Sequence, residues 1–270
     1  MQVEKRKSLF IIINSTAFYL LAYLLVYMLF QLTTIIFSNV FDIPNTLYYN
    51  RIGFNVRPEA WTFDSVKVIY SSGNVLLFLL SITFLVVIFK AIEFDGFLRL
   101  FFVWGFIHTI SMLLGSFIIG AFNFEGFGIV LSYLYLADTA KMLLLFTGLL
   151  LLIAIGMAMV KPFLFTANIY FKFLSPGMRP TFRRDQFILP FFLSTFILMV
   201  LKYPTTLYEN LMLIIPVFVL LPLFWGIGRF PVFYFEETEK SIKLHLKLVV
   251  GTIVIFIMYR VFLGIGINLG

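Results

Sequence analysis

Residues 139–160 read TAKMLLLFTGLLLLIAIGMAMV, a run whose one charged residue, Lys141, lies near its start. A helix rises about 1.5 Å per residue, so a run of this length can cross the roughly 30 Å hydrocarbon core of a bilayer. The same character holds along the chain, which is 61% hydrophobic and 12% charged, against about 45–50% and about 25% in soluble domains. The sequence therefore predicts a multi-pass membrane protein. It excludes a soluble enzyme, a nucleic-acid-binding module and a disulfide-stapled domain.

Seven apolar segments are candidates for membrane crossings. They cover residues 9–30, 74–92, 98–121, 139–160, 187–201, 209–228 and 247–268. In lipid every backbone N–H and C=O group must be paired within its own segment, which predicts α-helices. The fifth segment is short and contains Pro190, so we expect it to be irregular. The predicted fold is an all-α polytopic transmembrane helix bundle, one domain over residues 1–270, with seven crossings.

Three segments between these spans are predicted to have different structures. Residues 126–136 are apolar but too short to cross, so they form either an interfacial or a re-entrant piece, and Asp138 can cap the helix that follows. Residues 38–73 form the predicted extracytoplasmic loop, with its aromatic side chains at headgroup depth. Residues 161–186 mix phenylalanine with basic residues, which is typical of an interfacial segment, and form the predicted basic cytoplasmic loop.

The basic residues give the bundle a direction. Basic side chains concentrate in cytoplasmic loops, which predicts a cytoplasmic N-terminus and an extracytoplasmic C-terminus. On this topology, 14 of the 20 basic residues are cytoplasmic: Lys5, Arg6, Lys7, Lys90, Arg99, Lys161, Lys172, Arg179, Arg183, Arg184, Arg229, Lys240, Lys243 and Lys247. The net charge of +7 then suits anionic lipid on the cytoplasmic side rather than nucleic acid. The expected location is the cell membrane, specifically a bacterial inner membrane.

Ionisable residues inside predicted spans are the first candidates for function, because each costs roughly 2.5–3.5 kcal/mol to insert. Arg260 lies near the midpoint of the last span and His108 near the midpoint of the third. Asp138 and Lys141 lie at the start of the fourth. Together these four residues form the candidate intramembrane polar site.

Arg260 is expected to turn into the bundle. Helical side chains lean toward the N-terminus of their helix, which opposes an outward reach of Arg260 and favours an acid or free carbonyl groups as its partner. Asp138 is the preferred acid, with Glu125 and Glu209 in reserve. A role in a pathway or in ligand binding is one interpretation. A plain ion pair that fixes helix register, or an Arg260 that reaches the headgroups, is the other.

Small and polar residues follow the face of the third span that carries His108. They are Gly105, Thr109, Gly115, Ser116 and Gly120. Small residues let membrane helices approach closely, so we expect a helix-packing face in which the imidazole of His108 bonds a carbonyl group. The alternative is a polar seam in which His108 carries protons or contacts a substrate.

Motifs of catalysis are absent from the sequence. The chain has no cysteine and two histidines, so thiol chemistry and the His-Glu-x-x-His metalloprotease motif are excluded. Neither Gly-x-Ser-x-Gly nor a phosphate-binding P-loop occurs. We therefore predict no catalytic residue, no cofactor and no metal site.

Three functions remain open at this stage. A non-catalytic membrane component, a subunit or scaffold with protein partners, is preferred by a narrow margin. The alternative is a small-solute or ion transporter that uses Arg260, His108 and Asp138, and an intramembrane enzyme with an unusual site comes third. A transporter predicts a water-accessible cavity that reaches Arg260 or His108, whereas a scaffold predicts that packing seals both residues.

Overall fold

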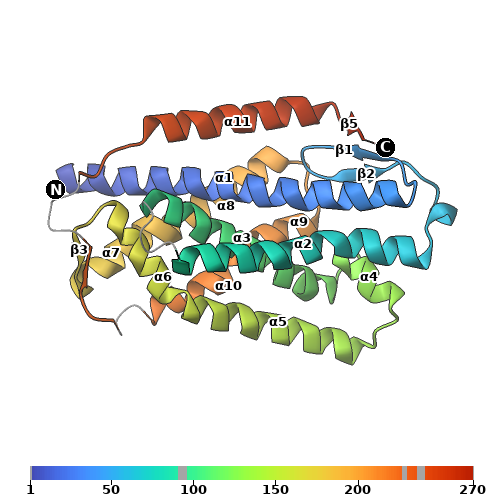
Figure 1. Ribbon diagram of the computed structural model, residues 1–270, viewed down its shortest axis with the longest axis horizontal. Helices are drawn as coiled ribbons and strands as arrows, with labels where there is room; N and C mark the ends of the chain where they lie inside the picture. The colour runs from blue at the N-terminus through green and yellow to red at the C-terminus, as the bar shows by residue number, and fades with distance from the viewer. Residues whose placement is uncertain (1, 91–95, 227–229, 236–240, 270) are drawn as a thin grey trace.

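Seven long apolar helices lie side by side in the computed structural model, which describes residues 2–90, 96–226, 230–235 and 241–269 (Figure 1). The crossing elements are α1 (Gln2–Val40), α2 (Phe63–Lys90), α3 (Gly96–Gly120), α5 (Asp138–Ala158), α8 (Leu189–Lys202), the joined α9 (Leu207–Ile214), α10 (Pro216–Leu220) and η6 (Leu221–Phe224), and α11 (Leu246–Gly264). The termini lie at opposite ends of the bundle, which we call the N-terminal end and the C-terminal end (Figure 1). The predicted all-α membrane bundle is confirmed, and the chain is a multi-pass membrane protein.

Helix α3 is the centre of the bundle. Of its most apolar window, 83% is buried, compared with 17% for α5 and for α11. Small residues allow the close packing around it: a Cβ atom added at Gly105 would lie 2.9 Å from the ring of Phe84 in α2, and one added at Gly148 of α5 would lie 2.8 Å from Ile118. The uncovered apolar faces of α5 and α11 are left for lipid.

Short elements close the C-terminal end. Strand β1 (Asn45–Leu47) pairs antiparallel with both β2 (Ile52–Phe54) and β5 (Ile267–Asn268), and η1 (Pro58–Ala60) follows. The buried Asn45 ties this small sheet to the end of α1, because its side-chain amide donates to the Ser38 hydroxyl at 2.9 Å. Helix α4 (Phe127–Tyr133) packs against α2 and α3 at the same end.

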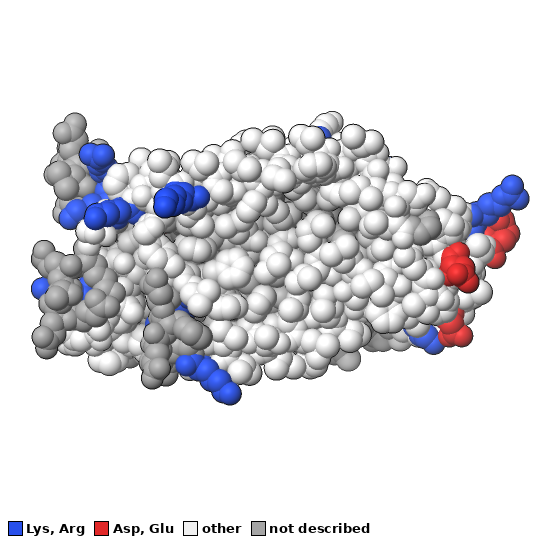
Figure 2. Space-filling model, turned by 45° about the horizontal axis from the view of Figure 1, so that its top comes forward, with Lys and Arg blue, Asp and Glu red and all other residues white. Residues whose placement is uncertain are grey.

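The N-terminal end is built from a series of short turns of helix. They are α6 (Val160–Phe165), η3 (Thr166–Ile169), η4 (Pro176–Met178), α7 (Arg179–Arg183) and the π-helix η5 (Arg184–Ile188). Strand β3 (Phe173–Leu174) pairs with β4 (Phe233–Tyr234). Most charged side chains on the face seen in Figure 2 lie at its two ends, where the coloured atoms at the left, N-terminal end are all basic and those at the right are of both signs.

The first two helices extend further than the predicted spans, so both ends of the predicted 38–73 loop are helical. Helix α1 continues to Val40 and α2 begins at Phe63, which leaves a connection over residues 41–62. A reciprocal cap fixes the start of α2: the backbone N–H of Ser65 donates to the Thr62 hydroxyl at 3.1 Å, and that of Thr62 donates to the Ser65 hydroxyl at 2.9 Å. Hydropathy marks only the part of a helix that lies in hydrocarbon, which is why both helices continue beyond the predicted spans.

The last three spans also differ from the expected limits. The fifth crossing segment begins at Pro176 rather than at residue 187, and it is irregular because the π-helix interrupts it before α8. The sixth ends at Phe224 and changes helix at Pro216, while the last ends at Gly264 rather than at residue 268. The chain turns there at Gly266, whose φ of +83° is open to glycine, and enters β5.

Candidate functional site

A cavity of about 330 Å³ lies between α1, α2, α3, α4 and α9 at the C-terminal end, and we call it the C-terminal cavity. Its volume falls at the lower limit of the range of about 300–1,000 Å³ that is usual for ligand sites. Its walls are mostly apolar, with polar groups among them. The polar lining residues are Tyr23, Tyr27, Gln31, Thr34, Asn50, Arg51, Tyr70, Asn74, Ser116, Glu125, Lys202, Thr206, Tyr208 and Glu209.

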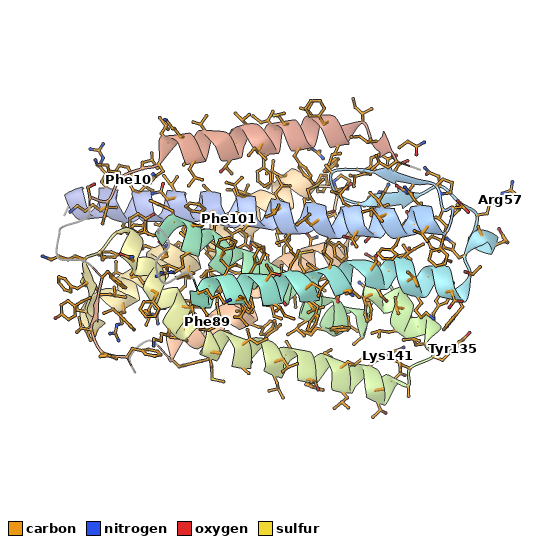
Figure 3. All side chains as sticks on the ribbon, in the orientation of Figure 1. Phe10, Arg57, Phe89, Phe101, Tyr135 and Lys141 are labelled. Atoms are coloured by element: carbon orange, nitrogen blue, oxygen red, sulfur yellow. The ribbon has the colours of Figure 1, made fainter. Side chains whose placement is uncertain are left out.

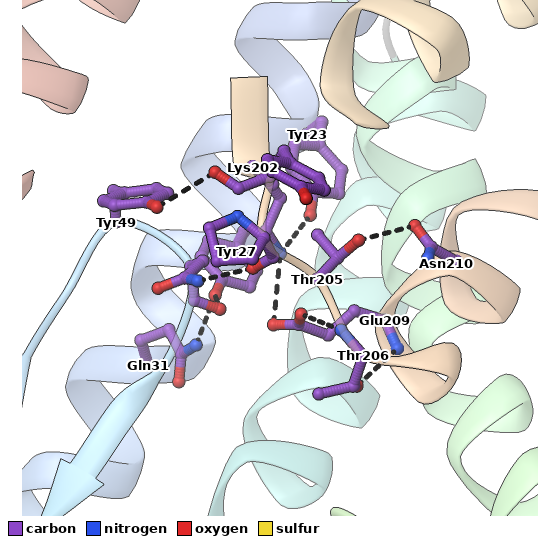
Figure 4. A network of polar contacts seen from close by, with 12 residues as sticks. Tyr23, Tyr27, Gln31, Tyr49, Lys202, Thr205, Thr206, Glu209 and Asn210 are labelled. Carbon is purple, nitrogen blue, oxygen red and sulfur yellow. Dashed lines mark hydrogen bonds and ion pairs between the residues drawn. The ribbon is translucent and has the colours of Figure 1, made fainter. Parts of the chain in front are cut away.

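Lys202, the last residue of α8, forms the centre of the polar network in this cavity (Figure 4). It is only 4% exposed. Its ammonium group donates to the Tyr23 hydroxyl at 3.2 Å and lies 3.9 Å from the centre of the Tyr27 ring. The nearest acid is Glu209, whose carboxylate oxygen is 3.9 Å from the Lys202 nitrogen. A buried cation is therefore held by a hydroxyl group, a ring face and a carboxylate together.

Local structure positions the acid of this pair. The side chain of Glu209 accepts a hydrogen bond from the backbone N–H of Thr206 at 3.0 Å, and the Thr206 hydroxyl accepts one from the N–H of Glu209 at 3.3 Å. This capping box starts α9 and holds the carboxylate beside the end of α8. The charge pair thus bridges the break between two crossing segments.

One stripe of α1 supplies much of the remaining polar surface. Its members recur at every fourth position, which places them on a single face of the helix: Ser15, Tyr19, Tyr23, Tyr27 and Gln31. The Gln31 amide donates to the Tyr27 hydroxyl at 2.6 Å, and that hydroxyl donates to the carbonyl of Asn50 at 2.6 Å. The cavity wall is therefore tied to the connection over residues 41–62.

Aromatic packing closes the bundle toward its middle. Tyr19, Trp104 and His108 form what we call the aromatic seal: the Tyr19 ring lies 4.8 Å from the Trp104 ring and 4.3 Å from the His108 ring. His108 is 2% exposed, and its Nε2 atom lies 3.2 Å from the carbonyl oxygen of Tyr19. The ring of Tyr23 lies 5.4 Å from His108, so the seal directly adjoins the Lys202 network.

A second cavity, of about 260 Å³, lies at the N-terminal end and is named here the N-terminal cavity. It is lined by Phe97, Ile169, Tyr170, Ser241, Lys243 and His245. Asn14 of α1 holds its wall, because its amide donates to the Tyr170 hydroxyl at 3.2 Å and to the carbonyl of Lys243 at 2.9 Å. Burial raises the pKa of the Tyr170 hydroxyl, which keeps the group protonated.

The four residues of the predicted polar site do not come together. His108 lies in the aromatic seal, whereas Asp138 and Lys141 lie at the C-terminal end, where Figure 3 labels Lys141. The carboxylate of Asp138 is 3.6 Å from the Lys141 nitrogen, and its side chain is 97% exposed. Among the residues that the structure describes, no ion pair joins Arg260 to Asp138, to Glu125 or to Glu209.

Arg260 has partners of another kind. Its guanidinium carbon lies 3.4 Å from the centre of the Tyr49 ring, and its Nη2 donates to the carbonyl of Tyr203 at 3.3 Å. Because α11 ends at Gly264, Arg260 lies near the end of its helix and not at the midpoint, and it reaches the connections of the C-terminal end. Beside it, α1, α8 and α11 enclose an apolar groove that lies apart from the C-terminal cavity.

The predicted packing face of α3 is divided among several neighbours. A Cβ atom at Gly115 would lie 3.0 Å from the sulfur of Met212 in α9, and one at Gly120 would lie 2.9 Å from the backbone of Gly128 in α4. Ser116 lines the C-terminal cavity, and the buried Thr109 donates to the carbonyl of Phe106 at 3.0 Å. The face therefore contacts α4 and α9 as well as α2.

Sequence reasoning missed the C-terminal cavity. Lys202 falls between the predicted fifth and sixth spans, among the basic residues that are not predicted to be cytoplasmic, and Glu209 was considered only as a further partner for Arg260. The available signal was the four-residue spacing of polar and aromatic residues in α1, which is unusual in a span that hydrocarbon surrounds. No group of three His, Asp or Glu side chains within the described residues could hold a metal ion.

Comparison with protein families, with curated proteins and with solved structures finds no match for this chain.

Proposed function

We propose that this protein is a small-solute transporter whose binding site is the C-terminal cavity. The observation that carries the proposal is the buried Lys202 with its partly buried partner Glu209, both of which line a cavity of about 330 Å³ that stops at the aromatic seal. Ionisable groups inside a membrane protein are costly and commonly mark substrate or ion pathways. A structural role alone gives no reason to keep a partly polar cavity beside them.

The arrangement along the bundle supports transport over permanent binding. Cavities occur at both ends, and tightly packed aromatic side chains separate them. Many transporters bind their solute between such a seal and one surface, and then open toward the other surface by moving helices around the site. The irregular fifth and sixth segments, with a π-helix and a break at Pro216, give the bundle places where such a movement can occur.

The non-catalytic component is the second candidate. It is favoured by α5 and α11, each only 17% buried over its most apolar window, because a protein partner could cover such helices. Lipid covers apolar helix faces equally well, however, and a scaffold leaves the charged cavity without a use. For this reason we prefer the transporter to the non-catalytic component, which the sequence alone favoured.

We further propose the orientation that the sequence predicts, with the N-terminal end in the cytoplasm of a bacterial cell and in contact with anionic lipid. The basic residues at that end support this orientation (Figure 2). The C-terminal cavity then faces the outside and takes up solute from there.

Single cysteine variants test the proposal, because the natural chain has no cysteine and therefore no other thiol that could react. Ser116→Cys places a thiol in the cavity wall, whereas Ser15→Cys places one in α1 on the far side of the seal from the cavity. We expect a membrane-impermeant thiol reagent to label Ser116→Cys from the C-terminal side only. Ser15→Cys should react slowly and from the N-terminal side only, since it becomes exposed when the bundle opens there.

The outcomes separate the two candidates. Ser116→Cys that stays unlabelled from both sides, in protein that elutes as a single species and melts like the parent, would refute an open cavity. Labelling of Ser116→Cys combined with complete protection of Ser15→Cys from both sides would refute transport, since the seal would never open.

A further inference from the structure

The C-terminal cavity has one charge that the protein leaves unmatched. Lys202 and Glu209 neutralise each other, and the other charged lining residues are Arg51 and Glu125. Glu125 is half-buried in the turn between α3 and α4. Within the described part of the chain, no ion pair reaches its carboxylate. A partly buried carboxylate without a cation beside it favours the binding of one.

The backbone around Glu125 keeps the turn in place. The N–H of Glu125 donates to the side-chain oxygen of Asn123 at 3.0 Å, and Gly126 follows with a φ of +55° that glycine adopts readily. Tyr208 packs against this glycine so closely that a Cβ atom there would lie 2.5 Å from its hydroxyl oxygen. The position of the acid is thus built into the fold.

A second acceptor in the cavity wall is also unused. Asn74 is 6% exposed and lines the cavity, and its side-chain oxygen accepts no hydrogen bond in the described structure. A buried polar atom without a partner costs stability, and most such atoms in folded proteins are satisfied. Together with the carboxylate of Glu125, the wall offers acceptors to a ligand that brings N–H donors.

Aromatic rings form much of the remaining wall. Six that contribute are Tyr23, Tyr27, Phe30, Phe54, Tyr70 and Tyr208. Ring faces attract cations, and the ammonium group of Lys202 already shows this at the Tyr27 ring. Neither Lys141 nor Arg51 neutralises the charge of Glu125 in place of a ligand. Lys141 pairs with Asp138, and Arg51 is exposed to water, where its field is screened.

We propose that the C-terminal cavity binds an organic ammonium ion with a small apolar body, and that Glu125 is its counter-ion. This inference rests on the proposed function, since it names the class of solute that the transporter takes. The ammonium group lies at Glu125 with Asn74 as an additional acceptor, and the apolar body lies among the rings. The volume of about 330 Å³ suits one aromatic ring with a short chain.

Three probes of the same shape and different charge test the inference on the purified full chain in detergent, by calorimetric titration at neutral pH. They are phenylbutylammonium, phenylbutanol and phenylbutyrate. We expect saturable binding of phenylbutylammonium, and at least about tenfold weaker binding of the alcohol and the acid, a difference of about 1.4 kcal/mol. Equal binding of all three, or tighter binding of phenylbutyrate, overturns the inference. This comparison needs no variant, so a folding defect cannot obscure it.

A matched pair of variants then locates the counter-ion. Glu125→Gln keeps the size of the side chain and should weaken binding of phenylbutylammonium by about tenfold or more. Glu59→Gln neutralises an exposed acid of η1 at the same end of the bundle, one that takes part in no ion pair among the described residues, and it should leave binding unchanged. Unchanged binding by Glu125→Gln refutes Glu125 as the counter-ion. If Ser116→Cys and Ser15→Cys are both labelled as expected but phenylbutylammonium does not bind, the proposed function stands and only the ammonium class fails.

Discussion

At the scale of single residues, the stability of the Lys202 network depends on three unlike partners. A hydroxyl group, a ring and a carboxylate each offset part of the cost of burying the ammonium group. The contacts to the acid are long, so the pair is coupled less tightly than a bidentate ion pair would be. Removing one member of the network should therefore lower the stability of the folded protein without preventing it from folding.

Lys202→Met should lower the free energy of unfolding by about 1–3 kcal/mol, the cost of leaving a buried polar group unsatisfied. Glu209→Gln keeps the capping box of α9, because glutamine can also accept from the N–H of Thr206, and it removes only the charge. We expect the double variant to lose less than the sum of the single losses, by about 0.5–3 kcal/mol. Unfolding in mixed micelles, followed by circular dichroism, measures all four proteins. Losses that add within about 0.3–0.5 kcal/mol would show that the two charges are not coupled.

Arg260 and Asp138 should behave independently, contrary to the expectation from sequence that they pair. Arg260→Leu removes the stacking on Tyr49 and the bond to Tyr203, so we expect a loss of about 0.5–2 kcal/mol. Asp138→Asn should change stability by less than about 0.5 kcal/mol, because the side chain is exposed and surface ion pairs contribute little. Thermal unfolding of the detergent-solubilised single and double variants checks both statements. A large loss of stability in Asp138→Asn that is not additive with the loss in Arg260→Leu would show that the two residues do form a pair.

At the scale of helices, glycines set how closely neighbouring helices pack. A Cβ atom at Gly156 of α5 would lie 2.3 Å from the carbonyl oxygen of Val219 in α10, which is backbone and cannot turn aside. Gly156→Ala must therefore push the two helices apart, and we expect a loss of about 1–3 kcal/mol. Gly251→Ala is the matched control, since nothing lies within 4 Å of its Cβ position on α11. It should be neutral or should stabilise by up to about 1 kcal/mol through helix propensity.

Thermal unfolding in one detergent, with helix content measured at each temperature, compares the two alanine variants directly. Equal effects of Gly156→Ala and Gly251→Ala would mean that the approach of α5 to α10 is not tight. The same samples report whether the fold survives, since a melted bundle loses its cooperative transition.

The sequence predicted the number and type of the crossing helices because each carries its own hydrophobic run, a local property. Their ends were predicted poorly, since hydropathy does not register a cap such as that formed by Thr62 and Ser65, or a turn such as that at Gly266. The C-terminal cavity was not predictable for a different reason. Lys202 and Tyr23 are hydrogen-bonded although they are 179 positions apart, so only the tertiary packing of α1 and α8 brings them together.

At the scale of the whole molecule, the charges at the two ends differ in kind. Basic side chains occupy the N-terminal end of the visible face, whereas both signs occur at the C-terminal end (Figure 2). Basic residues close to the ends of spans decide orientation, while acidic ones contribute little. An odd number of crossings places the two termini on opposite sides of the membrane, in agreement with their positions in Figure 1.

Accessible positions for a test of this topology follow from the structure. Arg57, labelled in Figure 3, and Gly177 are exposed at opposite ends of the bundle. Arg57→Cys and Gly177→Cys should react with a membrane-impermeant maleimide from opposite faces of intact cells and inverted vesicles. We expect Arg57→Cys to react in intact cells and Gly177→Cys only in inverted vesicles, because the proposed orientation places the basic end in the cytoplasm. The reverse pattern would contradict the orientation but keep the crossing number. Reaction of both variants from one face would contradict the odd number of crossings, and with it the path from the C-terminal cavity to the far side of the membrane.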